Sequence, residues 1–185
     1  TTRNIPLNKL SNQLSEKTRT ILRNLAIDVY RNKNSLVLFT SLNSKLKSKD
    51  LARALASYMN TDDLNIAIIN FTFNTKNISH KDRPKLFKTF TTIENSHGLT
   101  VLQPDNQFKS IEFIARNDFQ EQLVSLQSEF DIVFLSADNS DALSLANALN
   151  GQQLPHFSIA RVKRTRSNSL TKLGALLPIQ GLIYE

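Results

Sequence analysis

Residues 40–50, TSLNSKLKSKD, place a Lys-Ser pair between an apolar run and a helix-like segment. The apolar run at 35–39 predicts a buried strand, and small and apolar residues at helical spacing over 48–59 predict a helix. A strand, a loop ending in Lys-Ser and a helix form the layout of a phosphate-binding loop, in which the lysine contacts phosphates and the hydroxyl binds Mg²⁺. Lys47 and Ser48 are therefore the first candidates for chemistry.

The loop itself argues against a bound nucleotide. A phosphate-binding loop needs glycines because its backbone N–H groups must approach the phosphates closely, and side chains would block that approach. Positions 43–46 carry NSKL, with no glycine. Lys47 and Ser48 could still be the phosphate-binding lysine and the Mg²⁺-binding hydroxyl if the loop is one residue shorter than usual. Without glycines, however, the backbone around them cannot enclose a phosphate. The segment thus predicts the architecture of a nucleotide site without the nucleotide.

The surrounding elements alternate between strands and helices. Apolar runs predict strands at 35–40, 66–72, 99–103, 131–136, 157–162 and 180–184. Helical periodicity predicts helices at 11–30, 48–59, 140–150 and 167–177 and one or two helices within 109–128, and a short helix is expected at 83–90. Strands that are continuously apolar are typical of a parallel sheet buried between helices. We predict an α/β fold with a mostly parallel sheet, helices on both faces and a single domain over 1–185.

Composition excludes several classes of protein. A chain of 185 residues with 40% apolar and 21% charged residues is typical of a globular protein rather than a disordered one. Its longest apolar runs are too short to span a bilayer. There is no cysteine, so disulfides and thiolate metal sites are excluded.

The net charge of +7 favours an anionic partner such as nucleic acid, anionic lipid or an acidic protein surface. The denser basic clusters lie at 45–49 and 161–166, and a solvated basic surface is the plainer interpretation of both. The second cluster lacks interleaved aromatic residues for base stacking, so nucleic acid is not the expected partner. His80, His97 and His156 are scattered without a His-x-His pair, and no metal site is predicted.

The order of segments resembles the cytoplasmic domain of the bacterial tyrosine autokinases, the Wzc/CapB-type P-loop proteins of capsule and exopolysaccharide export. The resemblance covers about residues 14–184 and rests on weak local matches in the right order. EKTRTILRNL (16–25) is similar to the family's EAFRTLRTNL, RPKLFKTF (83–90) to RPRLHRLF, and FDIVFLSADN (130–139) to FDYVIIDTPP. GLTVLQPD, DALSLA and IARVKRTR resemble further family segments. The resemblance implies a P-loop NTPase-like three-layer sandwich.

Residues in the family's catalytic slots differ from the family pattern. The second Walker-type strand of the family supplies two aspartates, and Asn70 and Thr72 stand at those positions here. The Walker B aspartate is replaced by Ser136. The nearest carboxylate, Asp138, is expected in a turn. Because neither Asn nor Thr can act as a carboxylate base and Mg²⁺ prefers charged oxygens, we predict a pseudo-enzyme with no catalytic residue, no metal and no bound cofactor.

The resemblance also implies partners. In the family the first helix packs between the protomers of a ring, and Glu16 and Arg19 match its motif. The second motif arginine falls on Leu22, with Arg23 one step later, so the interface is an expectation with altered spacing. We expect a non-catalytic scaffold of exopolysaccharide biosynthesis at the cytoplasmic face of the membrane. Its partners would be a membrane chain-length regulator (a polysaccharide co-polymerase), a second copy of the chain or the anionic lipid surface.

Two alternatives remain open from the sequence. The first is an active ATP- and Mg²⁺-dependent tyrosine autokinase with divergent motifs. The second is a non-catalytic, degenerate relative of the MinD/ParA-type ATPases, acting in localisation or DNA partitioning. ATP binding separates the scaffold from the kinase, and the neighbouring genes separate it from the localisation proteins.

Overall fold

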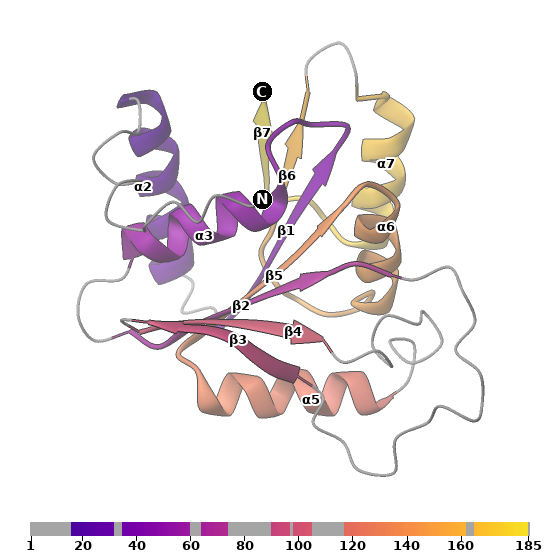
Figure 1. Cartoon of the computed structure of the whole chain (residues 1–185). Helices are drawn as coiled ribbons and strands as arrows, with labels where there is room; N and C mark the ends of the chain where they lie inside the picture. Colours follow the sequence, from indigo (N-terminus) through magenta and orange to yellow (C-terminus); the bar gives the residue numbers. More distant parts are fainter. Residues whose placement is uncertain are drawn as a thin grey trace.

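A computed structural model describes residues 16–31, 35–59, 64–73, 90–96, 98–104, 117–161 and 165–184 (Figure 1). Strands and helices alternate through most of this part of the chain, as the apolar runs predict. The elements in chain order are α2 (Glu16–Arg31), β1 (Leu36–Leu42), α3 (Ser48–Met59), β2 (Ile66–Phe71), β3 (Phe90–Ser96), β4 (Leu99–Pro104), α5 (Asn117–Glu129), β5 (Ile132–Asp138), α6 (Asn139–Ala148), β6 (His156–Ala160), α7 (Ser167–Leu176) and β7 (Gly181–Tyr184).

The strands form one seven-stranded sheet in the order β3-β4-β2-β5-β1-β6-β7. All neighbouring pairs are parallel except β3 with β4, which is antiparallel. The predicted mostly parallel α/β fold is therefore confirmed. The six predicted strands agree with β1, β2, β4, β5, β6 and β7 to within two residues at each end.

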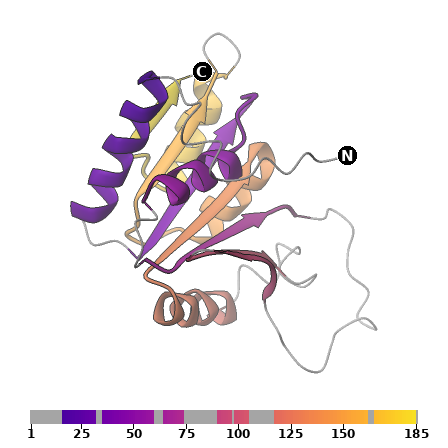
Figure 2. The ribbon, with the colours of Figure 1, turned by 60° about the vertical axis from the view of Figure 1, so that its left-hand side comes forward.

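Helices cover both faces of the sheet, as predicted. Helices α2 and α3 pack on one face, and α5, α6 and α7 lie on the other (Figures 1 and 2). The bounds of α3 coincide with the predicted 48–59, whereas α2 begins at Glu16 and α5 begins at Asn117. Among the described residues, no helix has both the length and the apolar character needed to cross a bilayer.

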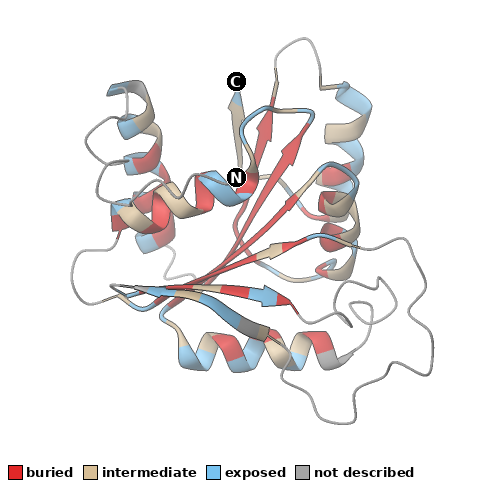
Figure 3. Ribbon diagram, viewed as in Figure 1, coloured by how far each residue is buried: buried red, intermediate tan, exposed pale blue. Residues whose placement is uncertain are grey.

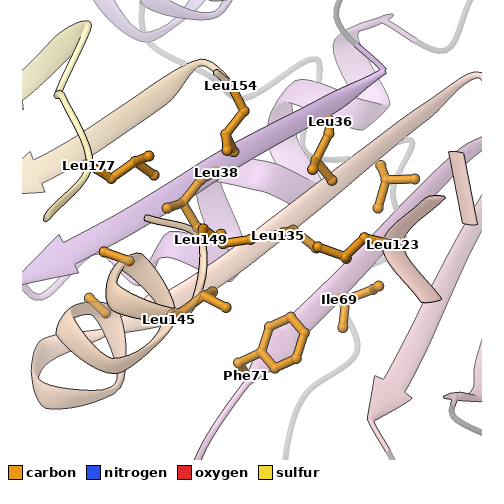
Figure 4. Close-up of a cluster of buried hydrophobic side chains, with 14 of the residues drawn as sticks. Leu36, Leu38, Ile69, Phe71, Leu123, Leu135, Leu145, Leu149, Leu154 and Leu177 are labelled. Atoms are coloured by element: carbon orange, nitrogen blue, oxygen red, sulfur yellow. The ribbon is translucent and has the colours of Figure 1, made fainter. Parts of the chain in front are cut away.

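Strand β1 shows how the sheet divides the interior into two cores. All of its residues are buried, because helices cover the sheet on both sides (Figure 3). Side chains alternate along a strand, so Leu36 and Leu38 enter one core and Val37 and Phe39 enter the other. The first core lies beneath α5, α6 and α7, where Leu38, Leu135 and Leu145 are among its members (Figure 4).

The structure differs from the predicted elements around Phe90–Ser96. Strand β3 was not predicted, because its residues FTTIENS lack a continuous apolar run. The strand is not fully buried in the structure, where Ile93 is 60% exposed. The short helix expected at 83–90 ends at Phe90, which instead begins β3. The rest of that helix lies outside the described residues, as do the start of the helix predicted from residue 11 and residues 109–116 of another.

Candidate functional site

The candidate site lies where the carboxyl ends of β2, β5 and β1 meet. These strands are neighbours in the sheet, and ligands of open α/β folds bind at this edge. The register pairs Asn70 with Ser136 and Ser41 with Asp138. The sheet therefore brings the segments that carry Ser48, Asn70 and Ser136 to one edge. Thr72 follows β2 and is exposed.

Loop 43–47 connects β1 to α3 in a conformation that the residues themselves support. Asn43 has φ of 52°, in the left-handed region that asparagine tolerates better than most residues. The Leu46 amide donates to Ser44 Oγ at 3.0 Å. The Lys47 carbonyl accepts hydrogen bonds from the amides of Asp50 and Leu51, which starts the helix. Side chains at every position of the loop restrict how closely a phosphate could approach its backbone.

The side chains of Asn70 and Ser136 are hydrogen-bonded to each other. Ser136 is fully buried, and its hydroxyl donates to Asn70 Oδ1 at 3.0 Å and lies 3.3 Å from the Ile69 carbonyl. Both side chains are neutral. The pair thus engages the Ser136 hydroxyl and the Asn70 Oδ1 atom and supplies no negative charge for a divalent cation.

The sequence named Asp138 only as the nearest carboxylate and did not single out Asn139, and the structure gives both a role at this edge. We expected Asp138 in a turn, and this was wrong. Asp138 is the last residue of β5, and Asn139 begins α6. The Asp138 carboxylate accepts the Ser48 amide at 3.0 Å, and Asn139 Oδ1 accepts the Asn43 amide at 2.9 Å. An Asp-Asn pair between a strand and a helix is a signal for capping, because both side chains bind backbone amides readily. Here the amides belong to a different loop, which the sequence does not reveal.

Asp141 adds a second carboxylate to this edge. Burial raises the pKa of Asp141 above its usual value, and the negative charge of Asp138 raises it further, while a hydrogen bond from the Phe73 amide opposes the rise. The β5–α6 corner, residues 138–141, therefore contacts both the loop after β1 and the end of β2.

Comparisons with known proteins identify the fold. No protein-family model and no curated protein matches the chain. The kinase domain of the Escherichia coli tyrosine kinase ETK superposes with a TM-score of 0.67 at 16% identity, covering 100% of this chain and 81% of that one. The chain has the fold of bacterial tyrosine kinase domains. The BceF tyrosine kinase domain also superposes with a TM-score of 0.67 at 14% identity, covering 91% of this chain and 76% of that one. For the VpsO kinase domain the TM-score is 0.62 at 15% identity, with coverage of 91% and 95%.

The tyrosine kinase fold implies ATP and Mg²⁺, and the residues present do not fit them. In favour of a metal, Ser48 Oγ is buried and has no hydrogen-bond partner within the described part of the chain. Against it, Asp138 already binds the Ser48 amide and Asn139 binds the Asn43 amide. The neutral Asn70–Ser136 pair stands where the resemblance places carboxylates.

His156 has a structural role in this kinase-like fold. It begins β6 and is fully buried; its Nδ1 lies 3.0 Å from the Leu177 carbonyl and its Nε2 lies 2.9 Å from Thr40 Oγ1. A carbonyl can only accept, so Nδ1 carries the proton and Nε2 accepts from Thr40. His80 and His97 lie outside the described residues, within which no cluster of His, Asp and Glu suits a metal ion.

The residues proposed for an interface lie on the outer side of the kinase-like domain. Glu16, Arg19 and Arg23 are all exposed on α2, at spacings that place them on one flank of the helix. Ile27 and Tyr30 continue that flank and are 41% and 49% exposed. Figure 2 shows α2 at the outside of the molecule.

The basic clusters are only partly described. In the first, Lys45 and Lys49 are exposed and Lys47 is half-buried. In the second, Arg161 is half-buried and Arg166 is exposed, whereas 162–164 lie outside the described residues.

Proposed function

We propose that this chain is a non-catalytic binding and scaffold domain with a tyrosine kinase fold. It works in exopolysaccharide biosynthesis and export, together with a membrane chain-length regulator at the cytoplasmic face of the membrane. The observation that carries the proposal is that the Asn43 and Ser48 amides, at the two ends of the loop, are bound by the chain's own side chains. The family resemblance supplies the exopolysaccharide system and its partner.

The physical argument concerns what phosphoryl transfer requires. Its catalysis is mainly positioning and charge stabilisation, with backbone amides around the phosphates and carboxylate-held Mg²⁺ between them. Loop 43–47 has no glycine, and Asn70 and Ser136 offer neutral oxygens only. Asp138, the nearest carboxylate in the sequence, is engaged at the start of α3. Each of these features weakens nucleotide binding separately, and together they favour a scaffold over a kinase.

The purified chain is expected to show no Mg²⁺-dependent ATP binding at about millimolar concentration. The reason is that both the amide cradle and the anionic metal ligands are missing or engaged. Isothermal titration calorimetry with ATP and Mg²⁺ measures this directly. Micromolar binding that Lys47→Ala abolishes would overturn the proposal and make the autokinase the better interpretation.

The partner surface is proposed on α2. The flank of Glu16, Arg19, Arg23, Ile27 and Tyr30 combines arginine, an aromatic ring and apolar area. Arginine and tyrosine are enriched in protein interfaces, because they provide both contact area and directed hydrogen bonds. The net charge of +7 also suits an anionic membrane, where each nearby Lys or Arg contributes ~1 kcal/mol.

Reversing two charges of this flank, with Glu16→Lys and Arg19→Glu together, is expected to weaken self-association or binding to the membrane regulator. Thermal stability should change little, because exposed ion pairs contribute ~0.2–1 kcal/mol to folding. Analytical ultracentrifugation and a pull-down with the regulator measure association, and thermal unfolding measures stability.

The control is the reversal Asp28→Lys on the same helix. Asp28 is exposed, and because it is not three or four positions from Glu16, Arg19, Arg23, Ile27 or Tyr30, helical spacing puts it on another flank of α2. Association should survive in this control. If the Glu16 and Arg19 variant associates as well as the control does, α2 is not the interface.

A further inference from the structure

The β5–α6 corner binds loop 43–47 at both of its ends. Asp138 accepts the amide of Ser48, the first residue of α3, and Asn139 accepts the amide of Asn43, the first residue after β1. Asn43 and Asn139 each have φ of 52°, and they are the two described non-glycine residues with positive φ. Asn43 and Asn139 both have this uncommon backbone conformation, and the Asn139 side chain binds the Asn43 amide. This combination indicates a specific arrangement rather than a chance contact.

Asp138 does not serve the helix that it precedes. It stands at the position before α6, where aspartate commonly caps the following helix, yet its side chain makes no such capping bond. The carboxylate instead reaches the start of α3, far away in sequence. The N-terminus of a helix carries a partial positive charge and attracts anions, and in phosphate-binding loops the anion is a phosphate.

We propose that Asp138 and Asn139 form an internal clamp in which the Asp138 carboxylate takes the place of an anionic ligand at the start of α3. The clamp holds loop 43–47 in one conformation. The loop is then a structural connection between β1 and α3 rather than a binding site. The inference rests on the proposed function in one respect, that no nucleotide phosphate competes for these amides.

Two features beside the clamp cost free energy. Ser48 is fully buried, and its hydroxyl lacks a hydrogen-bond partner within the described residues, so the closed loop leaves a polar atom unsatisfied. Asp138 also keeps its place although its charge acts on Asp141. The amide contacts at Asn43 and Ser48 help to offset this cost.

The test removes each contact separately. Asp138→Ala removes the carboxylate, and Asp138→Asn keeps an acceptor without the charge. Asn139→Gly removes the second acceptor while allowing the positive φ at that position. Asp131→Ala is the matched control, because Asp131 also accepts a backbone amide, that of Asn65 at 2.8 Å, but at the beginning of a strand region rather than at a helix N-terminus.

Hydrogen exchange of the full chain reports on the loop. In Asp138→Ala the Ser48 amide should exchange about ten-fold faster or more, and the melting temperature should fall by a few degrees. Added formate, a small carboxylate, should slow that exchange again. Asp138→Asn should fall between the wild type and the alanine variant. Asn139→Gly should accelerate exchange at Asn43, and formate should have no effect on the wild type or Asp131→Ala.

The outcomes separate the clamp from the proposed function. Unchanged Ser48 exchange in Asp138→Ala, or exchange that formate does not slow, would overturn the clamp whatever the nucleotide titration shows. Mg²⁺-ATP binding by the wild type would overturn the proposed function, and protection of Ser48 by that ATP would overturn the clamp as well. If only the double variant Asp138→Ala, Asn139→Gly binds ATP, the clamp is upheld as an inhibitory contact and the permanent loss of the site is refuted.

Discussion

Replacing Phe39 with alanine is expected to lower the free energy of unfolding by ~3–5 kcal/mol. Phe39 is fully buried in the core beneath α2 and α3. Its ring meets Phe134 edge-on at a centroid distance of 5.3 Å and stacks on Phe157 at 5.8 Å. Truncation would remove both aromatic contacts and leave a cavity between three neighbouring strands, β5, β1 and β6.

Chemical denaturation with the same slope for both proteins would measure this loss. Val124→Ala is the control, because Val124 is 65% exposed on α5 and such a change is usually within ~0.5 kcal/mol. A loss below about 1 kcal/mol for Phe39→Ala would show that the core beneath α2 and α3 does not stabilise the sheet as described. The prediction bears on the proposed scaffold role, because binding a partner through a fixed surface depends on a rigid framework.

Acidification from pH ~7 to ~5 is expected to destabilise the fold by about 2 kcal/mol through His156 alone. Burial lowers the pKa of His156 from 6.5 to about 4, and the hydrogen bond with Leu177 opposes this only in part. In the unfolded chain the imidazole takes up a proton near its ordinary pKa. The stability that the neutral ring contributes is therefore fully present above pH 6.5 and is lost as the pH falls towards 4.

The variant His156→Asn isolates this effect. Its shorter amide keeps a donor for the Leu177 carbonyl but does not titrate. The quantity to compare is the change in unfolding free energy between the two pH values, since the substitution itself also alters stability. A wild-type pH dependence no steeper than that of the variant would show that His156 is not held neutral in the fold.

The sequence by itself determined the class of fold. Continuous apolar runs such as LVLF and IVFL, alternating with helical segments, are typical of a parallel sheet covered on both faces by helices. The strand–loop–helix pattern singled out Lys47 and Ser48, and the family resemblance added Asn70 and Ser136 as positions of interest. Strand β3 escaped prediction because it lies at the edge of the sheet, where polar residues are tolerated and no apolar signal is needed.

Only the tertiary structure decided what occupies the candidate site. Asp138 and Asn43 are distant in the chain, and a local pattern cannot show that the β5–α6 corner meets the loop after β1. That meeting follows from the parallel pairing of β1 with β5, which sets Ser41 beside Asp138. Sequence spacing governs local periodicity and capping, whereas a hydrogen bond between separate loops depends on strand order and register, and these are settled when the whole sheet forms.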